Sequence, residues 1–320
     1  MEIGVYVPSG VPGVTGRTVL DWARQADRGP FSSVAVADRL RYGNLEQLTT
    51  LAAVAAVTER VRIVAGIALA PLRPGVLWAK EVATVAAYAP GRLTLGVGIG
   101  GRAQDYECAG VPWSRRGTIL DEHLETLDGL RGHTDEQQLG PALGAVEILV
   151  GGASAPALRR LTRHGDGYLG GGLTPEIFGA EAFACTLAWR AAGRPGRPRL
   201  VASCWYASST DVEDAASDFL RSYLWQGGPP AFVNSGIARG DDGIRAAVEQ
   251  YRDQGADELI FFPCGSDVAE LDWLAERVPG LPDPPRGEPR PPAVPPAFDP
   301  AATVPGTNGV VVGAGAPARA

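Results

Sequence analysis

Short apolar segments and longer segments of helical spacing alternate along most of this chain, and this alternation constrains its fold more than any other feature. Eight runs of strand length are present, and helical stretches separate them. Val61–Ala70 is an almost continuous apolar run, which suits a strand that is buried on both faces. Repeated strand–helix units predict a parallel sheet, and eight of them predict a closed (β/α)₈ TIM barrel. An open doubly wound sheet is the alternative.

The expected elements follow from this pattern. The strands are Ile3–Pro8, Ser33–Ala37, Val61–Ala70, Arg92–Gly101, Val146–Gly151, Tyr168–Leu169, Leu200–Ala207 and Leu259–Pro263. The helices are Arg17–Arg28, Leu45–Glu59, Val76–Tyr88, Ile119–Leu130, Pro156–His164, Pro175–Ala192, Asp211–Trp225, Asp241–Gln254 and Val268–Arg277. From Pro279 onward, prolines and small residues replace the pattern and cannot build a core. We therefore predict a barrel over residues 1–278 and a disordered Pro/Ala/Gly-rich tail over residues 279–320.

Composition excludes several classes of protein. The net charge of −7 argues against binding to nucleic acid, because neutralising phosphates needs a clustered excess of Lys and Arg. No run reaches the roughly 18–20 apolar residues of a membrane span. The four cysteines are widely spaced, which favours free thiols in a cytoplasmic protein. The three histidines form no ligand pattern, so we expect no metal site.

Glycine clusters follow three of the expected strands. In a (β/α)₈ barrel the active site lies at the carboxyl ends of the strands, so these clusters should meet at one mouth. They are Gly96–Gly101, Gly151–Ser154 and Gly170–Gly172. Glycine lets the backbone approach a ligand without a Cβ atom in the way. The second cluster also precedes a helix, whose free N–H groups and Ser154 hydroxyl suit a phosphate. Tight βα turns alone could also explain the glycines.

A charged pair, Asp38 and Arg39, ends the second strand. Buried charges are unfavourable unless they meet a ligand or a partner, so this pair belongs either to the active site or to a structural ion pair at the rim. No Ser–His–Asp arrangement is visible. The chain thus offers a ligand cradle with few groups for proton transfer, which fits a protein whose cofactor carries the chemistry. Trp113, Tyr223 and Trp225 could line a substrate pocket or shield the core.

Three motifs resemble the bacterial luciferase-like monooxygenase family. Leu95–Gly100 with Asp105–Pro112, Arg116 and Glu122 is similar to one family signature. Ile148–Ser154 with His164–Tyr168 is similar to a second, and Ser33–Asp38 to a third. The family comprises enzymes that use FMN and enzymes that use the deazaflavin coenzyme F420. The F420-dependent oxidoreductase branch resembles this chain better in its size and in its short insertion after the fourth strand.

The resemblance implies roles for particular residues. It implies that a non-prolyl cis peptide bond at Ala68–Leu69, beside Ile67, lies behind the deazaflavin ring. The remaining cofactor-binding residues that it implies are Gly98, Gly100, Gln104, Gly151, Gly152, Ala153, Ser154, Gly171 and Gly172. Position 39 holds Arg where many F420-dependent relatives have His, and Arg cannot easily act as a base. It could instead stabilise negative charge on a substrate carbonyl or on the cofactor.

Three functions are compatible with these observations. The first is an F420H2-dependent reductase that transfers a hydride to a polarised C=C or C=N bond of a small molecule. Asp38, Arg39, Tyr42 and Asp105 are then the candidate catalytic residues, with Asp38, Tyr42 or Asp105 as the acid unless water supplies the proton. The second is an FMN-dependent monooxygenase, and the third is a non-catalytic flavin-binding barrel. The Ala-rich helix at Leu45–Val57 and the helix at Val76–Tyr88 could form the interface of a homodimer or pack on their own barrel.

Overall fold

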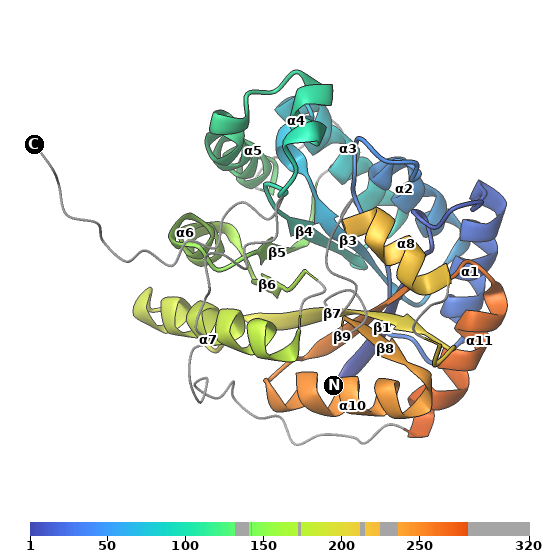
Figure 1. The fold of residues 1–320 in the computed structure, drawn as a ribbon. Coiled ribbons are helices and arrows are strands. Elements are labelled where there is room, and N and C mark those ends of the chain that lie inside the picture. The colour runs from blue at the N-terminus through green and yellow to red at the C-terminus, as the bar shows by residue number, and fades with distance from the viewer. Residues whose placement is uncertain (132–140, 142, 172–173, 212–214, 225–235, 281–320) are drawn as a thin grey trace, which may run out of the picture.

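A computed structural model describes residues 1–131, 141, 143–171, 174–211, 215–224 and 236–280. Eight parallel strands close into a barrel, which confirms the predicted fold (Figure 1). The strands are β1 (Glu2–Tyr6), β2 (Ser33–Val36), β3 (Arg62–Ala68), β4 (Leu93–Val97), β5 (Glu147–Gly151), β6 (Gly167–Leu169), β7 (Arg199–Ala207) and β9 (Glu258–Pro263). The order runs from β1 to β7 and then to β9, and β9 pairs with β1 and thereby closes the ring. The tail predicted for residues 279–320 lies, from residue 281, outside the described residues.

The helices surround the strands, and they differ from the expected set at a few places. The α-helices are α1 (Gly16–Arg28), α2 (Gln47–Val57), α3 (Gly75–Tyr88), α4 (Ala103–Ala109), α5 (Arg116–Arg131), α6 (Ala155–His164), α7 (Pro175–Ala191), α8 (Ala215–Leu224), α10 (Gly240–Asp253) and α11 (Val268–Arg277). Short 3₁₀ turns are η1 (Ala70–Leu72), η2 (Trp113–Arg115) and η4 (Val278–Gly280). The sequence pattern missed α4 and the short strand β8 (Ile237–Arg239), which pairs with the end of β7. Both elements are too short to show a period.

Two apolar layers hold the barrel together. Alternate strand residues point outward and inward, so Val5 packs in the layer between strands and helices while Tyr6 packs inside the barrel. Inside, Tyr6 stacks on Phe262 with ring centroids 4.4 Å apart, and Trp205 lies 3.9 Å from Phe262. The interior is therefore a packed core rather than an open channel.

Charged side chains close the amino end of the barrel. Glu2, Arg62, Glu147 and Arg199 come from β1, β3, β5 and β7, that is, from alternate strands, as expected for one layer of a (β/α)₈ barrel. Glu258 on β9 is 1% exposed and accepts hydrogen bonds from Ser33, Arg62 and Arg199. Arg199 also pairs with Glu147. Cations and anions thus satisfy one another at this end.

Helix α8 lies across the opposite end. Phe219, Leu220 and Tyr223 of this helix belong to the same buried cluster as Trp205 and Phe262 inside the barrel. Figure 1 shows α8 in front of the strands, over the barrel mouth. The carboxyl ends of the strands are therefore covered partly by a helix that is not one of the ring of outer helices.

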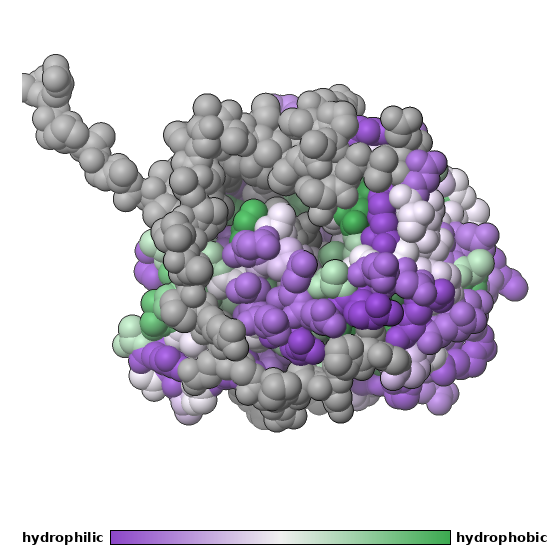
Figure 2. Space-filling view, turned by 60° about the horizontal axis from the view of Figure 1, so that its bottom comes forward, coloured by the Kyte–Doolittle hydropathy of each residue, from purple (hydrophilic) through white to green (hydrophobic). Residues whose placement is uncertain are grey.

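The surface that Figure 2 brings forward is mostly hydrophilic between the grey, undescribed segments. Elsewhere, α3 presents three large apolar residues at the surface. The exposed fractions of Val76, Leu77 and Tyr88 are 59%, 52% and 58%. Homodimerisation through this helix remains a prediction. None of the helices within the described part of the chain is long and apolar enough to cross a membrane.

Candidate active site

The glycine clusters after β4 and β5 meet in one cavity at the carboxyl end of the barrel. The cavity measures about 120 Å³. Its lining comes from the two loops, from α5 and from the first turns of α6, and consists of Gly98, Ile99, Gly100, Leu120, Val150, Gly151, Gly152, Ala153, Ser154, Ala157 and Arg160. Six of the residues proposed from sequence as cofactor ligands are thus brought together: Gly98, Gly100, Gly151, Gly152, Ala153 and Ser154.

The glycines of this cavity serve two different purposes. A Cβ atom on Gly151 would lie 2.1 Å from the Cδ1 atom of Ile67, and one on Gly100 would lie 2.9 Å from Leu69. These two glycines therefore make room for side chains at the end of β3. Gly152 differs, because it has φ +80° and a Cβ atom there would meet nothing within 4 Å. Its backbone faces open space and is accessible to a ligand.

The cis peptide bond lies at Gly66–Ile67, so its expected place at Ala68–Leu69 is wrong. Strand β3 pairs regularly with β4 up to Ala65 and again at Ala68, and the irregularity lies between these residues. The ladder thus includes Ala68, and the cis peptide bond lies within the irregular part of β3, two residues earlier than the resemblance implied. Ile67 and Leu69 both reach the loop glycines of the cavity, whereas Ala68 is fully buried.

Helix α6 contributes a hydroxyl and a buried guanidinium. Ser154 caps the helix, because its Oγ atom accepts a hydrogen bond from the backbone N–H of Ala157, which leaves the hydroxyl hydrogen available to a ligand. Arg160 is 7% exposed, lines the cavity and binds Asp121 through two hydrogen bonds of 2.6 and 3.2 Å. The sequence reasoning missed Arg160. Its spacing from Ala157 and Leu161 places it on the buried face of α6, which is the signal that could have revealed it.

Asp38 is engaged in a structural interaction at the ends of β2 and β3. Its carboxylate accepts a hydrogen bond of 2.8 Å from the backbone N–H of Leu69 and two hydrogen bonds from Arg73. Arg73 also pairs with Glu46. Asp38 thus pairs with Arg73 rather than with its neighbour Arg39.

Arg39 lies instead against two tyrosine rings. Its Cζ atom is 4.8 Å from the ring centroid of Tyr42 and 4.6 Å from that of Tyr223 on α8. Arg39 and Arg102 both donate a hydrogen bond to the carbonyl oxygen of Tyr223. Burial, and then the positive charge of Arg39, lower the pKa of Arg102 to about 10. The sequence analysis left open whether Tyr223 lines a pocket or shields the core, and the structure places it at the barrel mouth.

The other predicted residues fall around these two groups. Asp105 is buried at the start of α4 and accepts a hydrogen bond of 2.7 Å from the backbone N–H of Arg41. The Tyr42 hydroxyl lies 3.4 Å from the Ser222 hydroxyl. Gln104 and Gly171 are exposed and do not belong to the cavity lining that the structure describes. Gly172 and Trp225 lie outside the described residues, and Trp113 packs edge-on against Tyr106.

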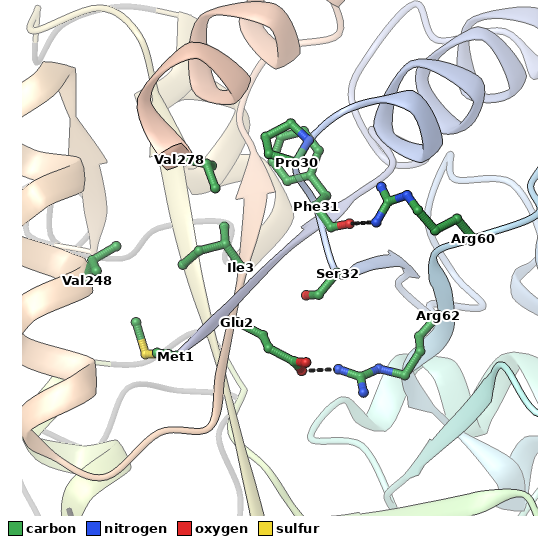
Figure 3. Close-up of a pocket in the computed structure, with 10 residues that line it drawn as sticks. All are labelled: Met1, Glu2, Ile3, Pro30, Phe31, Ser32, Arg60, Arg62, Val248 and Val278. Carbon is green, nitrogen blue, oxygen red and sulfur yellow. Dashed lines mark hydrogen bonds and ion pairs between the residues drawn. The ribbon is translucent and has the colours of Figure 1, made fainter. Parts of the chain in front are cut away.

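A larger hollow of about 560 Å³ lies at the amino end of the barrel (Figure 3). Apolar side chains such as Ile3, Val248 and Val278 line one side, and Arg60 and Arg62 lie on the other. Arg60 donates to the carbonyl oxygens of Phe31 and Gly29, and Arg62 pairs with Glu2. None of the site residues predicted from the sequence lines this hollow, which lies at the end of the barrel opposite the glycine loops.

Comparison with known proteins identifies the family of this chain. Residues 1–260 match the family model described as luciferase-like monooxygenase. The chain belongs to the luciferase-like monooxygenase family. The uncharacterized protein Rv0940c of Mycobacterium tuberculosis (strain ATCC 25618 / H37Rv) is 32% identical over 188 residues, which are 48% of this chain and 65% of that protein. The chain thus spans slightly less than two thirds of that relative's length.

Solved structures show the same fold. An F420-dependent secondary alcohol dehydrogenase in complex with an F420-acetone adduct matches with a TM-score of 0.72 and 17% identity, over 88% of this chain and 99% of that one. The oxygenating constituent of 3,6-diketocamphane monooxygenase from Pseudomonas putida, in complex with FMN, matches with a TM-score of 0.66 and 17% identity, over 89% and 99%. Proteins with this fold therefore include a deazaflavin-dependent enzyme and a flavin-dependent one.

Proposed function

We propose that this protein is a reductase that uses reduced coenzyme F420 and transfers a hydride to a polarised C=C or C=N bond of a small organic substrate. The observation that carries the proposal is Arg39, a half-buried guanidinium at the carboxyl end of β2. A guanidinium stays charged and cannot accept a proton, so it is unsuited to drawing a proton from an alcohol. It is suited to stabilising negative charge that develops on an acceptor group during reduction.

The cavity after β4 and β5 fits the phosphate-bearing part of such a cofactor. Gly152 leaves its backbone open, Ser154 has a hydroxyl hydrogen to donate, and Arg160 supplies a cation that Asp121 orients. Ile67 and Leu69 lie against the glycines of the two loops, and under this proposal they provide the apolar surface for the flat ring. When bound, reduced F420 would supply the hydride, while these residues bind and orient it.

Among the proposed acids, Tyr42 is the best placed to return a proton. Asp38 is held by Arg73 and by the Leu69 backbone, and Asp105 is held by the backbone N–H of Arg41. Among the described residues, the hydrogen-bond partner of the Tyr42 hydroxyl is the Ser222 hydroxyl. Its ring also packs against Arg39, which places the hydroxyl beside the guanidinium that the proposal assigns to the acceptor group.

The test is a binding titration of the purified full chain with F420 and, separately, with FMN. We expect F420 to bind at least about tenfold more tightly, a difference of roughly 1.4 kcal/mol. Tighter binding of FMN would overturn the reductase proposal and favour the monooxygenase chemistry of the FMN-bound relative. Binding of neither would overturn the assignment of the cavity itself.

Arg160 offers a sharper version of the same titration. Replacing it by Met removes the buried cation of the cavity, and F420 binding should weaken about tenfold or more. Arg163→Met on the same helix is the control, because Arg163 is 68% exposed and pairs with Glu125 on the surface. Equal effects of the two substitutions would contradict a direct role for Arg160.

A further inference from the structure

The carboxyl end of β3 is held by hydrogen bonds that lie beyond its regular pairing with β2. The ladder between β2 and β3 ends at Ala65. Beyond that point, the backbone N–H of Leu69 donates a hydrogen bond of 2.8 Å to the carboxylate of Asp38, which follows β2. On the other side, the N–H of Gly98 after β4 donates to the carbonyl oxygen of Ala68 at 3.0 Å. The Asp38 side chain therefore replaces the β2 backbone as the partner of β3 at this point.

Arg73 fixes the orientation of the Asp38 carboxylate. Its guanidinium binds both carboxylate oxygens, at 2.7 and 3.2 Å, in the forked geometry that suits this pair. The Asp38 side chain is only 3% exposed, so water cannot take the place of Arg73 as its counter-charge.

Glu46 binds Arg73 from the start of α2. One oxygen of Glu46 accepts a hydrogen bond of 2.7 Å from Arg73, and the other caps α2 by accepting the N–H of Thr49 at 2.6 Å. Burial alone would raise the pKa of the Glu46 carboxyl, but the hydrogen bonds from Thr49 and Arg73 lower it, so the carboxylate stays ionised. We call Glu46, Arg73 and Asp38 the Arg73 bridge. It connects α2 and the ends of β2 and β3.

The strand end that the Arg73 bridge holds carries the apolar side of the cavity. A Cβ atom on Gly100 would lie 2.9 Å from Leu69, and one on Gly151 would lie 2.1 Å from Ile67. The two side chains thus already lie close against the glycine loops. Because packed interiors transmit small displacements, a movement of the Leu69 backbone would move this surface or the loops against it.

We propose that Arg73 is a positioning residue for the cofactor: through Asp38 it holds Leu69, and with Leu69 the surface against which the flat ring packs. This rests on the proposed function, because it takes the ring to lie on Ile67 and Leu69. Binding sites need their contact groups held within about 0.5 Å of the productive geometry. Arg73 does not touch the cofactor, since its fork binds Asp38 and Glu46. A lysine has no such fork and cannot bind both oxygens of Asp38 in this way while it also reaches Glu46.

The experiment titrates the full chain with F420 by fluorescence and records the circular dichroism of the bound cofactor, which reports how the ring lies against its surroundings. Arg73→Met should weaken F420 binding about tenfold or more and change the shape of the spectrum. Arg73→Lys keeps the charge and loses the fork, so it should retain part of the affinity and also show a changed spectrum.

Arg92→Met is the matched control. Arg92 is also half-buried and holds the opposite end of the same region, because it donates to the carbonyl oxygens of Thr58 and Val61, which precede β3. Its loss should lower stability, yet the folded variant should bind F420 with the affinity and the spectrum of the unmodified protein. Unfolding midpoints verify that each variant is folded, and Arg73→Lys carries the comparison if Arg73→Met does not fold.

Three results would overturn the proposal. The first is unmodified affinity and an unmodified spectrum in the folded Arg73 variants. The second is an equal change in Arg92→Met, because general loosening of the fold would then explain both. The third is weaker binding in Arg73→Met with an unchanged spectrum and a smaller dependence on salt concentration, because Arg73 would then contact the charge of the cofactor directly.

Running every titration with FMN as well separates this proposal from the proposed function. If the unmodified protein binds FMN and not F420, the reductase proposal falls, and the same comparison of Arg73 and Arg92 variants is read with FMN. If it binds F420 and the Arg73 variants match the unmodified protein, the cofactor assignment stands and the positioning role of Arg73 falls. Binding of neither cofactor overturns both.

Discussion

The charged side chains at the two ends of this barrel have different kinds of partner. At the amino end, Arg62 and Arg199 are surrounded by carboxylates, and Glu258 is almost completely buried among donors. At the carboxyl end, Arg39 has a carbonyl oxygen and two aromatic rings around it. The amino end has its charges balanced within the chain and holds the larger hollow, about 560 Å³. The difference separates an end whose charged side chains pair with one another from an end where Arg39 contacts a carbonyl oxygen and aromatic rings, and the proposed function relies on the second end.

The strongest test of this comparison makes the same substitution at both ends. Arg199→Met leaves Glu258 and Glu147 with only part of their positive charge, and removing one partner of a buried pair lowers stability by about 3–5 kcal/mol. Arg39→Met removes one hydrogen bond to a carbonyl and two cation–π contacts, so we expect a loss below about 2 kcal/mol. Urea unfolding of the three proteins measures both free energies of unfolding.

The effects of the two substitutions on function should have the reverse order, with the larger loss in Arg39→Met. Arg199→Met should leave the affinity for F420 unchanged in the folded protein, since Arg199 lies at the start of β7, away from the mouth. Arg39→Met should slow substrate reduction by the F420H2-loaded protein about tenfold or more, because it removes the guanidinium that stabilises negative charge on the acceptor group. If Arg39→Met proved as destabilising as Arg199→Met, the carboxyl end would be an ordinary structural element and the contrast would be wrong.

The sequence predicted the architecture well because its signal is periodic. Eight apolar runs in order sufficed for the strands of the closed barrel, although β8 and α4 were too short to be recognised. The glycine clusters after β4 and β5 were correctly expected to meet, because carboxyl ends of parallel strands share one rim. The charged layer at the amino end was not anticipated, although charged residues such as Glu2, Arg62 and Arg199 begin their strands.

Partners across the fold could not be predicted in the same way. Arg39 follows Asp38 directly, yet Asp38 binds Arg73, and Arg39 meets Tyr223, which is 184 residues away along the chain. Similarly, the chain alone does not say that Gly151 accommodates Ile67 while Gly152 faces open space. These distinctions depend on which side chain a neighbouring strand presents, and a pattern of residue types carries no such information.

A pair of glycine substitutions tests the cavity with a smaller effect on stability. Gly152 follows β5 at the carboxyl end, and Gly91 precedes β4 at the amino end. Their φ values are +80° and +71°, and a Cβ atom would meet nothing within 4 Å at either. Replacing each by Ala should therefore lower stability by a similar amount, about 1–2 kcal/mol, through the left-handed backbone alone.

The two Ala variants should differ in cofactor affinity. Gly152→Ala adds a methyl group where a ligand would approach, so F420 binding should weaken about tenfold or more, while Gly91→Ala should bind like the unmodified protein. Fluorescence titration measures the affinities, and urea unfolding confirms that the two stabilities match. Equal affinities in the two variants would show that Gly152 serves only the turn.

The smallest expected effect concerns His123 on α5, the helix whose Leu120 lines the cavity. The ring is 5% exposed, lies 5.5 Å from the Trp78 ring centroid, and has an Nδ1 atom without a partner. Burial lowers its pKa below the ordinary value of 6.5, so the folded protein keeps the ring neutral while the unfolded chain takes up a proton more readily. The contribution of His123 to stability is therefore fully present above pH 6.5 and is lost as the pH falls below it.

His123→Gln replaces the ring by a neutral group that does not titrate in this range. Compared with the unmodified protein, its free energy of unfolding should decline less steeply between pH 7 and pH 5, with parallel curves above pH 7. Other titrating groups, such as Glu181, whose pKa is raised by burial, are present in both proteins and cancel in the difference. Urea unfolding at a series of pH values gives this difference curve. Curves that stay parallel down to pH 5 would mean that the ring takes up its proton as readily in the folded protein as in the unfolded chain, and that burial behind the cavity does not lower its pKa.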